Sequence, residues 1–237
     1  MAIIREITFG DGTVVRITDW GDYPVYSRAV FDASSLAQLT ETFLFNYQVG
    51  AMIPVTNQRA TYADTNMPGS GQLPMGHQML VYSLQVIPDE FAYVDGDNKP
   101  NPLFLTPEAS VQTAYWKFRK IFHQTMLHLV VEQTKSFVEG RLDHFPAGGG
   151  FTIEHNSLVD DNLSAGVAGY QINNGIKTWA ATRRLAMPVH LGSLENFYVS
   201  LDWPRGNNLA ADQSGYEFKE GFGILIRLTG PRQRPTG

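Results

Sequence analysis

The sequence contains no cysteine. This absence excludes disulfide bonds, thiolate metal sites and cysteine nucleophiles. Charged residues are also scarce, at 17% of the 237 residues, and the formal net charge is −5. A basic footprint for nucleic acid across the whole domain is therefore not expected, which leaves room only for a local basic patch.

Long hydrophobic runs are missing as well. No apolar stretch approaches the roughly 20 residues that a transmembrane helix requires. The first six residues, Met1 to Glu6, lack the basic stretch and apolar segment of a signal peptide. We therefore expect neither a membrane-spanning helix nor a secretory leader.

The residues that are plentiful favour β-structure. Hydrophobic residues make up 43% of the chain and aromatic residues 12%, with 22 glycines and 13 prolines. This combination is typical of sheets joined by long ordered loops, not of helical bundles. Surfaces that contact partners lose charge at their centres, so the low charge also fits extensive interfaces.

Alternating apolar and polar residues predict most of the strands. The clearest alternation covers residues 79–87, 126–132, 185–190, 197–203 and 223–228. Glycine turns between β-branched runs predict two hairpins, at Asp11–Gly12 and at Asn174–Gly175. Antiparallel strands separated by long loops indicate a β-sandwich or a jelly roll. We predict a single domain over residues 1–237, with an extended C-terminal tail from about residue 229.

Two short helices are expected inside the long loops. The first spans about residues 34–43, where Leu36, Leu39 and Phe43 share one helical face. The second spans about residues 107–122 and begins at Thr106-Pro107-Glu108, a favourable helix start.

Motifs that carry chemistry are weak throughout the chain. The six histidines are scattered, and the pair His123 and His128 misses the spacing that shares a helical face. Asp95–Asn98 resembles the start of a calcium loop but continues with Lys and Pro, and Gly148–Gly150 lacks the residues of a phosphate-binding loop. We therefore predict no catalytic residue, no metal and no cofactor, and expect that the chain is not an enzyme. A carboxylate pair assembled only by the fold is left open.

Two groups of residues are candidates for subunit contacts. Trp20, Tyr23 and Tyr26 belong to a segment that we interpret as an ordered aromatic loop, although anchoring in the core fits Trp20 and Tyr23 equally well. Arg232 and Arg234 lie in the predicted tail and could reach a neighbouring subunit.

A basic cluster offers a candidate for phosphate contact. Lys117, Arg119 and Lys120 fall on the second predicted helix, beside two aromatic residues. They could contact packaged nucleic acid or lipid headgroups. The alternative is a helix face exposed to solvent.

The second half of the chain resembles a known group of proteins. The segments that carry the resemblance are His144–Gly150, Arg183–Val189, Glu195–Pro204 and Ile224–Arg232, together with the strand at Met79–Ile87. In their order they resemble the β-rich structural proteins of tailless icosahedral bacteriophages, the jelly-roll capsid group. The resemblance implies a shell subunit of eight antiparallel strands, and the chain length favours one jelly roll with insertions.

The sequence thus leads to two main hypotheses. The first is a capsid shell subunit, located in the virion after assembly in the host cytoplasm, that self-assembles through its loops and termini. Its partners would be copies of itself and other virion proteins, with an internal membrane or packaged nucleic acid as further contacts. No small-molecule substrate is expected. The alternative is a carbohydrate-binding or host-attachment module of a β-sandwich fold.

Overall fold

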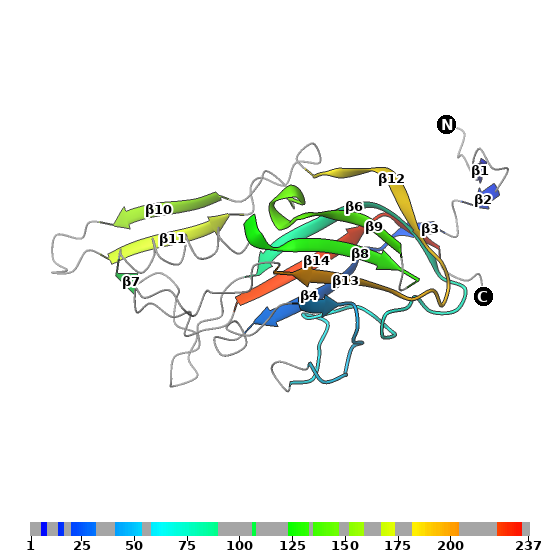
Figure 1. The fold of residues 1–237 in the computed structure, drawn as a ribbon, viewed down its shortest axis with the longest axis horizontal. Helices are drawn as coiled ribbons and strands as arrows, with labels where there is room; N and C mark the ends of the chain where they lie inside the picture. Colours follow the sequence, from blue (N-terminus) through cyan, green and yellow to red (C-terminus); the bar gives the residue numbers. More distant parts are fainter. Residues whose placement is uncertain are drawn as a thin grey trace.

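A computed structural model describes twelve parts of the chain, which together build a mainly β protein of antiparallel sheets (Figure 1). The described parts are residues 6–8, 14–16, 20–31, 41–53, 58–89, 106–107, 123–132, 135–146, 152–158, 167–173, 182–203 and 222–233. Within these ranges, no helix is long and apolar enough to cross a membrane.

The first of two large sheets is organised around one long central strand. Its strands are β3 (Trp20–Asp22), β4 (Val25–Phe31), β6 (Gln78–Asp89), β12 (Arg184–Leu191), β14 (Phe222–Thr229) and β15 (Pro231–Gln233). β6 pairs with β12 on one side and with β14 and β15 on the other. β4 pairs with β14, and β3 pairs with β15 in the same register. β3 with β4, and β14 with β15, therefore act as two long interrupted strands.

A close backbone approach separates β14 from β15. Four residues on this side, from Thr229 to Arg232, are opposed by five on β6, from Ser83 to Met79. At this bulge Gly230 faces β6 so closely that an added Cβ atom would overlap the carbonyl oxygen of Leu80 and lie 3.0 Å from its carbonyl carbon. Only glycine fits this position without displacing the backbone.

The second sheet has four strands in the order β5–β13–β8–β9. They are β5 (Glu41–Leu44), β8 (Met126–Val131), β9 (Lys135–Arg141) and β13 (Phe197–Asp202). The burial of β8 alternates strictly, with Leu127, Leu129 and Val131 buried and the residues between them half-buried. Because successive side chains on a strand point to opposite faces, one face of this sheet packs into the core and the other lies at the surface.

The two sheets share one hydrophobic core. A single cluster joins Leu84, Val86 and Ile226 of the first sheet to Leu129 and Val199 of the second. All five side chains are at most 2% exposed. Since each sheet buries one apolar face, this shared core fixes the two layers against each other.

Two smaller sheets lie outside the sandwich. β1 (Glu6–Thr8) and β2 (Val14–Arg16) form the hairpin predicted around Asp11–Gly12. β10 (Thr152–Leu158), β11 (Val167–Asn173) and β7 (Thr106–Pro107) form a three-stranded sheet, which projects from the left of the sandwich in Figure 1. A 3-10 turn, Leu142–His144, follows β9.

The expectation of a mainly β, antiparallel fold is confirmed, and the strands predicted by alternation appear as β6, β8, β12, β13 and β14. The two predicted helices are not borne out, because the described residues contain no α-helix of that length. The end of the first, Glu41–Leu44, is strand β5, and the start of the second, Thr106–Pro107, is strand β7. Pairing with β13 and with β11 overrides the local helical pattern there. The rest of both ranges, residues 34–40 and 108–122, lies outside the described residues.

Candidate assembly surfaces

The fold brings together residues from the two ends of the chain. Trp20 lies opposite Gln233 and Gly21 opposite Arg232 in the β3–β15 pair, so two of the predicted contact residues share one corner of the first sheet. The ring of Tyr23 folds back onto Gly21, where a Cβ atom would collide with it. Trp20 and Arg232 are half-buried, and Tyr23 is 41% exposed. This corner is therefore an aromatic and basic surface, although its residues form strands and not the predicted loop.

Tyr26 has a role inside the chain. It lies on β4, where its hydroxyl donates to the backbone oxygen of Tyr62 at 2.6 Å, and its amide donates to Oδ1 of Asn66 at 2.9 Å. These bonds hold the segment around residues 61–66 against the first sheet. The remaining predicted contact residue, Arg234, lies outside the described residues, as do Lys117, Arg119 and Lys120. Their contacts with subunits and with phosphate stay predictions.

The β4 edge of the first sheet is closed by this same segment. Thr65 forms a bridge with Ser27, and the Arg28 amide donates to the Asp64 oxygen at 2.8 Å. Asp64 is held in turn, because its carboxylate accepts from both the amide and the hydroxyl of Thr61 and lies 3.4 Å from Nη1 of Arg28. A closed edge cannot add a strand from another molecule.

The β12 edge is different, because it carries a wide bulge. Arg184 lies opposite Ser83 and Val189 opposite Val81, so five residue steps on β12 match only two on β6. We call residues 185–188, Leu-Ala-Met-Pro, the edge bulge. Three of its four residues are exposed, and Met187 at 80% is the most exposed large apolar side chain of the described chain. The two residues before the bulge, Arg183 and Arg184, are also exposed.

Two loops are joined at the end of the sandwich where β12 leads into β13. The Leu194 amide donates to the Leu73 oxygen at 3.2 Å, and the Gly76 amide donates to the Ser193 hydroxyl at 2.8 Å. The hydroxyl of Ser193 also donates to the Pro74 oxygen at 3.3 Å. Because both of its hydrogen-bonding roles are used, Ser193 serves as a structural link between these loops.

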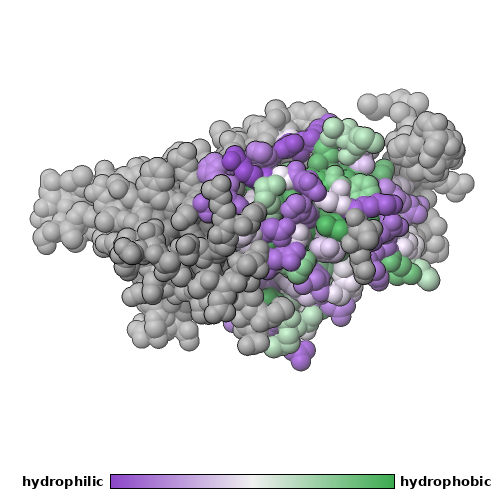
Figure 2. All heavy atoms as spheres, viewed as in Figure 1, coloured by the Kyte–Doolittle hydropathy of each residue, from purple (hydrophilic) through white to green (hydrophobic). Residues whose placement is uncertain are grey.

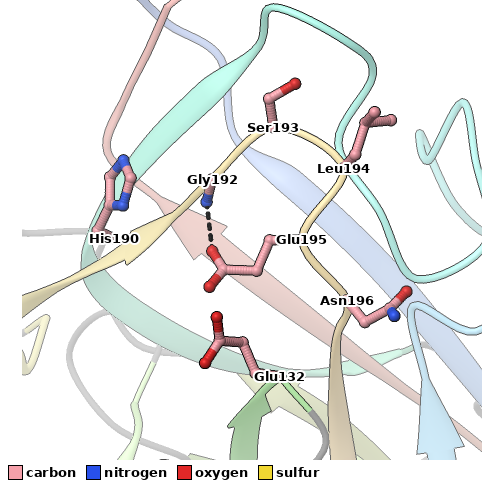
Figure 3. Close-up of a pocket in the computed structure, with 7 residues that line it drawn as sticks. All are labelled: Glu132, His190, Gly192, Ser193, Leu194, Glu195 and Asn196. Carbon is pink, nitrogen blue, oxygen red and sulfur yellow. Dashed lines mark hydrogen bonds between the residues drawn. The ribbon is translucent and has the colours of Figure 1, made fainter.

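A hollow of about 640 Å³ opens beside this junction (Figure 3). It is lined by Glu132, His190, Gly192, Ser193, Leu194, Glu195 and Asn196. In Figure 3 the carboxylates of Glu132 and Glu195 point toward one another, with the ring of His190 across the hollow. Both carboxylates already have partners: Glu195 accepts from the Gly192 amide at 2.6 Å, and Glu132 lies 3.4 Å from Nζ of Lys135. The hollow is thus polar and acidic, with its charges largely satisfied within the chain.

The outer face of the second sheet combines aromatic and charged side chains. One row across the sheet runs Phe43, Ser200, His128 and Glu139, and the next runs Glu41, Asp202, Met126 and Arg141. Figure 2 shows hydrophobic residues exposed among hydrophilic ones on the face that lies over β8 and β13. We call this surface, from Glu41 and Phe43 on β5 across to β9, the outer face.

An aromatic pair marks the apolar part of the outer face. The rings of Phe43 and Tyr198 meet edge to face with their centres 5.5 Å apart. Phe43 remains 41% exposed and Tyr198 is half-buried. Aromatic side chains have few rotatable bonds, so such a pair presents apolar area at little entropic cost on binding.

Acidic groups surround His128 beside this pair. Its Nε2 lies 3.1 Å from the Asp202 carboxylate and its Nδ1 lies 3.6 Å from that of Glu139. Partial desolvation raises the pKa of the neighbouring Glu41 carboxyl, and the charge of Asp202 together with a hydrogen bond to it raises this pKa further, against a smaller lowering by His128. Among the described residues, no group of three or more His, Asp or Glu side chains is placed to hold a metal ion. The carboxyl groups of Glu41, Glu139 and Asp202 make this part of the outer face acidic.

Comparisons with known proteins add no identification. No family model, curated protein or solved structure matches the chain.

The sequence interpretation missed the outer face and the edge bulge. The local pattern around Phe43 predicts a helix, and it gives no sign of the pairing with Ser200 on β13. Alternation places Tyr198, Ser200 and Asp202 on one side of the predicted strand at 197–203, but it does not indicate which strands lie beside them. Pro188 inside a strand was a signal for an edge or a bulge.

Proposed function

We propose that the chain is a jelly-roll shell subunit of a virion that self-assembles with copies of itself. The observation that carries this proposal is the order of the strands. When the two small outer sheets are set aside and the interrupted strands are joined, the first sheet takes the first, eighth, third and sixth strands along the chain. The second sheet takes the second, seventh, fourth and fifth. This is the order expected of two Greek keys wound into a jelly roll, an architecture common among capsid proteins.

Exposed apolar side chains favour a protein that assembles over one that stays monomeric. The described chain exposes nine large hydrophobic residues by 40% or more, among them Met75 at 77% and Met187 at 80%. Exposed apolar groups bordered by charge are typical of surfaces that contact other proteins. The resemblance of the C-terminal half to phage capsid proteins agrees with this assignment.

The test is the assembly state of the purified chain. We expect light scattering after size exclusion to show closed particles, or small oligomers that grow as concentration rises. Negative-stain microscopy of the same fractions should show their form. A chain that stays a monomer or dimer over a wide range of concentration and salt would contradict the proposal.

One observation favours carbohydrate binding as a second candidate function. The outer face places the Phe43–Tyr198 pair beside the carboxylates of Glu41 and Asp202. An aromatic ring can stack on a sugar while carboxylates accept hydrogen bonds from its hydroxyls. This function predicts a small, stable oligomer that binds glycans, with binding lost in Phe43→Ala.

A further inference from the structure

We propose that the edge bulge of one copy docks on the outer face of a second copy, and that this contact drives the assembly. The inference rests on the proposed self-assembly and names the two surfaces that meet. Met187 contacts the Phe43–Tyr198 pair, and Arg184 lies against the carboxylates beside that pair.

The first argument is the shape of the β12 edge. An ordinary edge strand could extend a sheet by pairing its backbone with another chain. Here residues 185–188 leave the ladder, and Pro188 has no amide hydrogen to donate. A partner therefore meets projecting side chains instead of a row of backbone groups, and the foremost is Met187.

The second argument is apolar complementarity. Methionine adapts its shape easily and makes favourable contacts between its sulfur and aromatic rings. The outer face offers such rings in Phe43 and Tyr198, whose centres lie 5.5 Å apart. A flexible apolar side chain and an aromatic pair are both exposed in the same chain, and this contact buries apolar surface of both.

The third argument is charge complementarity. Arg184 is exposed immediately before the edge bulge, next to Arg183, which is also exposed although its guanidinium lies over the Phe145 ring and donates to the His144 oxygen. The outer face carries Glu41, Glu139 and Asp202, and its Arg141 is engaged by Asp143 at 2.7 Å. A basic surface and an acidic surface with an apolar centre on each are expected to orient two copies and to suppress the reversed pairing.

The two surfaces are different parts of the chain, so the contact joins copies head to tail. A head-to-tail contact repeats from copy to copy and closes into a ring when the rotation allows, or continues otherwise. Each copy would use its edge bulge toward one neighbour and its outer face toward another. This is the arrangement that a shell subunit needs.

The experiment compares self-association of the full chain and matched variants by sedimentation over a concentration series. Met187→Glu should weaken association about tenfold or more, because it places a charge at the centre of the contact. Met75→Glu is the matched control, since Met75 is 77% exposed and lies on neither surface. Thermal unfolding of each variant should match that of the unmodified chain.

A charge exchange tests the orientation. Arg184→Glu and Glu41→Lys should each weaken association, and the double variant should recover most of it. Arg59→Glu, an exposed arginine away from both surfaces, should leave association unchanged.

The outcomes separate this inference from the proposed function. If the unmodified chain never associates, the proposed shell function fails. If it associates and Met187→Glu associates equally well, or if Met75→Glu is the variant that abolishes association, the docking inference is overturned while the shell function stands. Recovery in the double charge variant supports the docking inference directly.

Discussion

Both edges of the first sheet prevent the addition of a strand from another molecule, but they do so in opposite ways. At the β4 edge the chain supplies its own cover, because Thr65 bridges Ser27 and Asp64 binds Arg28. At the β12 edge no such cover is present among the described residues beside the bulge, and the ladder is interrupted instead. The difference teaches that a cover adds hydrogen bonds to the folded chain, whereas an interruption only prevents strand addition and leaves side chains free to contact a partner.

The largest expected loss of stability lies between the edges, where Gly230 approaches β6 closely. Gly230→Val should destabilise the fold by about 3 kcal/mol or more, because its Cβ would overlap the Leu80 backbone. Urea unfolding measures this loss. Gly69→Val is the control, since a Cβ atom there comes no closer than 3.5 Å to Gln72. Equal stability of the two variants would show that the bulge at Gly230 can relax.

The next effect tests the covered edge. Ser27 is fully buried, and its hydroxyl accepts the Phe45 amide at 3.0 Å. Ser27→Ala leaves that amide without a partner and should cost about 1 to 3 kcal/mol in the free energy of unfolding. Hydrogen exchange should also rise at the Phe45 amide. A variant with unchanged exchange at that amide would contradict the assigned hydrogen bond.

A smaller effect is expected at the interrupted edge. Met187→Ala should change the free energy of unfolding by less than about 0.5 kcal/mol, because the side chain is 80% exposed. Chemical denaturation at low protein concentration, where copies are apart, gives the value. A loss as large as that for Ser27→Ala would mean that the edge bulge packs within its own chain, and the contrast between the edges would disappear.

The smallest effect concerns charge on the outer face. The raised pKa of Glu41 means that the folded chain holds this proton more tightly than the unfolded chain does. Stability should therefore fall slightly as pH rises from the ordinary value of 4.5 through the raised pKa. Glu41→Gln should remove this part of the pH dependence, as followed by thermal unfolding across pH. An unchanged profile would show that Glu41 is not the group responsible.

The strands were predictable where one face is buried and the other is not. Apolar residues recur at every second position in residues 126–132 and 223–228, because every second side chain of these strands faces the core. β5 was not predictable, since Leu36, Leu39 and Phe43 fit a helix and only pairing with β13 decides otherwise. The local spacing of apolar residues carries no information about a partner strand that is distant in the sequence.

The candidate surfaces were predictable only in part. Trp20, Tyr23 and Arg232 stand out by residue type, but their meeting at one corner depends on the register between β3 and β15. The acidic cluster around His128 combines residues from β8, β9 and β13. Sequence spacing cannot predict such a cluster, because its members meet through the order of the strands in the sheet.

The pairing of β4 with β14 also determines when the first sheet can form during synthesis. Val25 meets Leu228, so β4 pairs with a strand that is synthesised much later. During translation β4 has no such partner until β14 has left the ribosome. Such distant pairings make folding slow, and an apolar strand that waits is open to aggregation. Newly made chains should accordingly depend on chaperones until β14 is released, and a variant that stalls synthesis before Phe222 should yield no native first sheet.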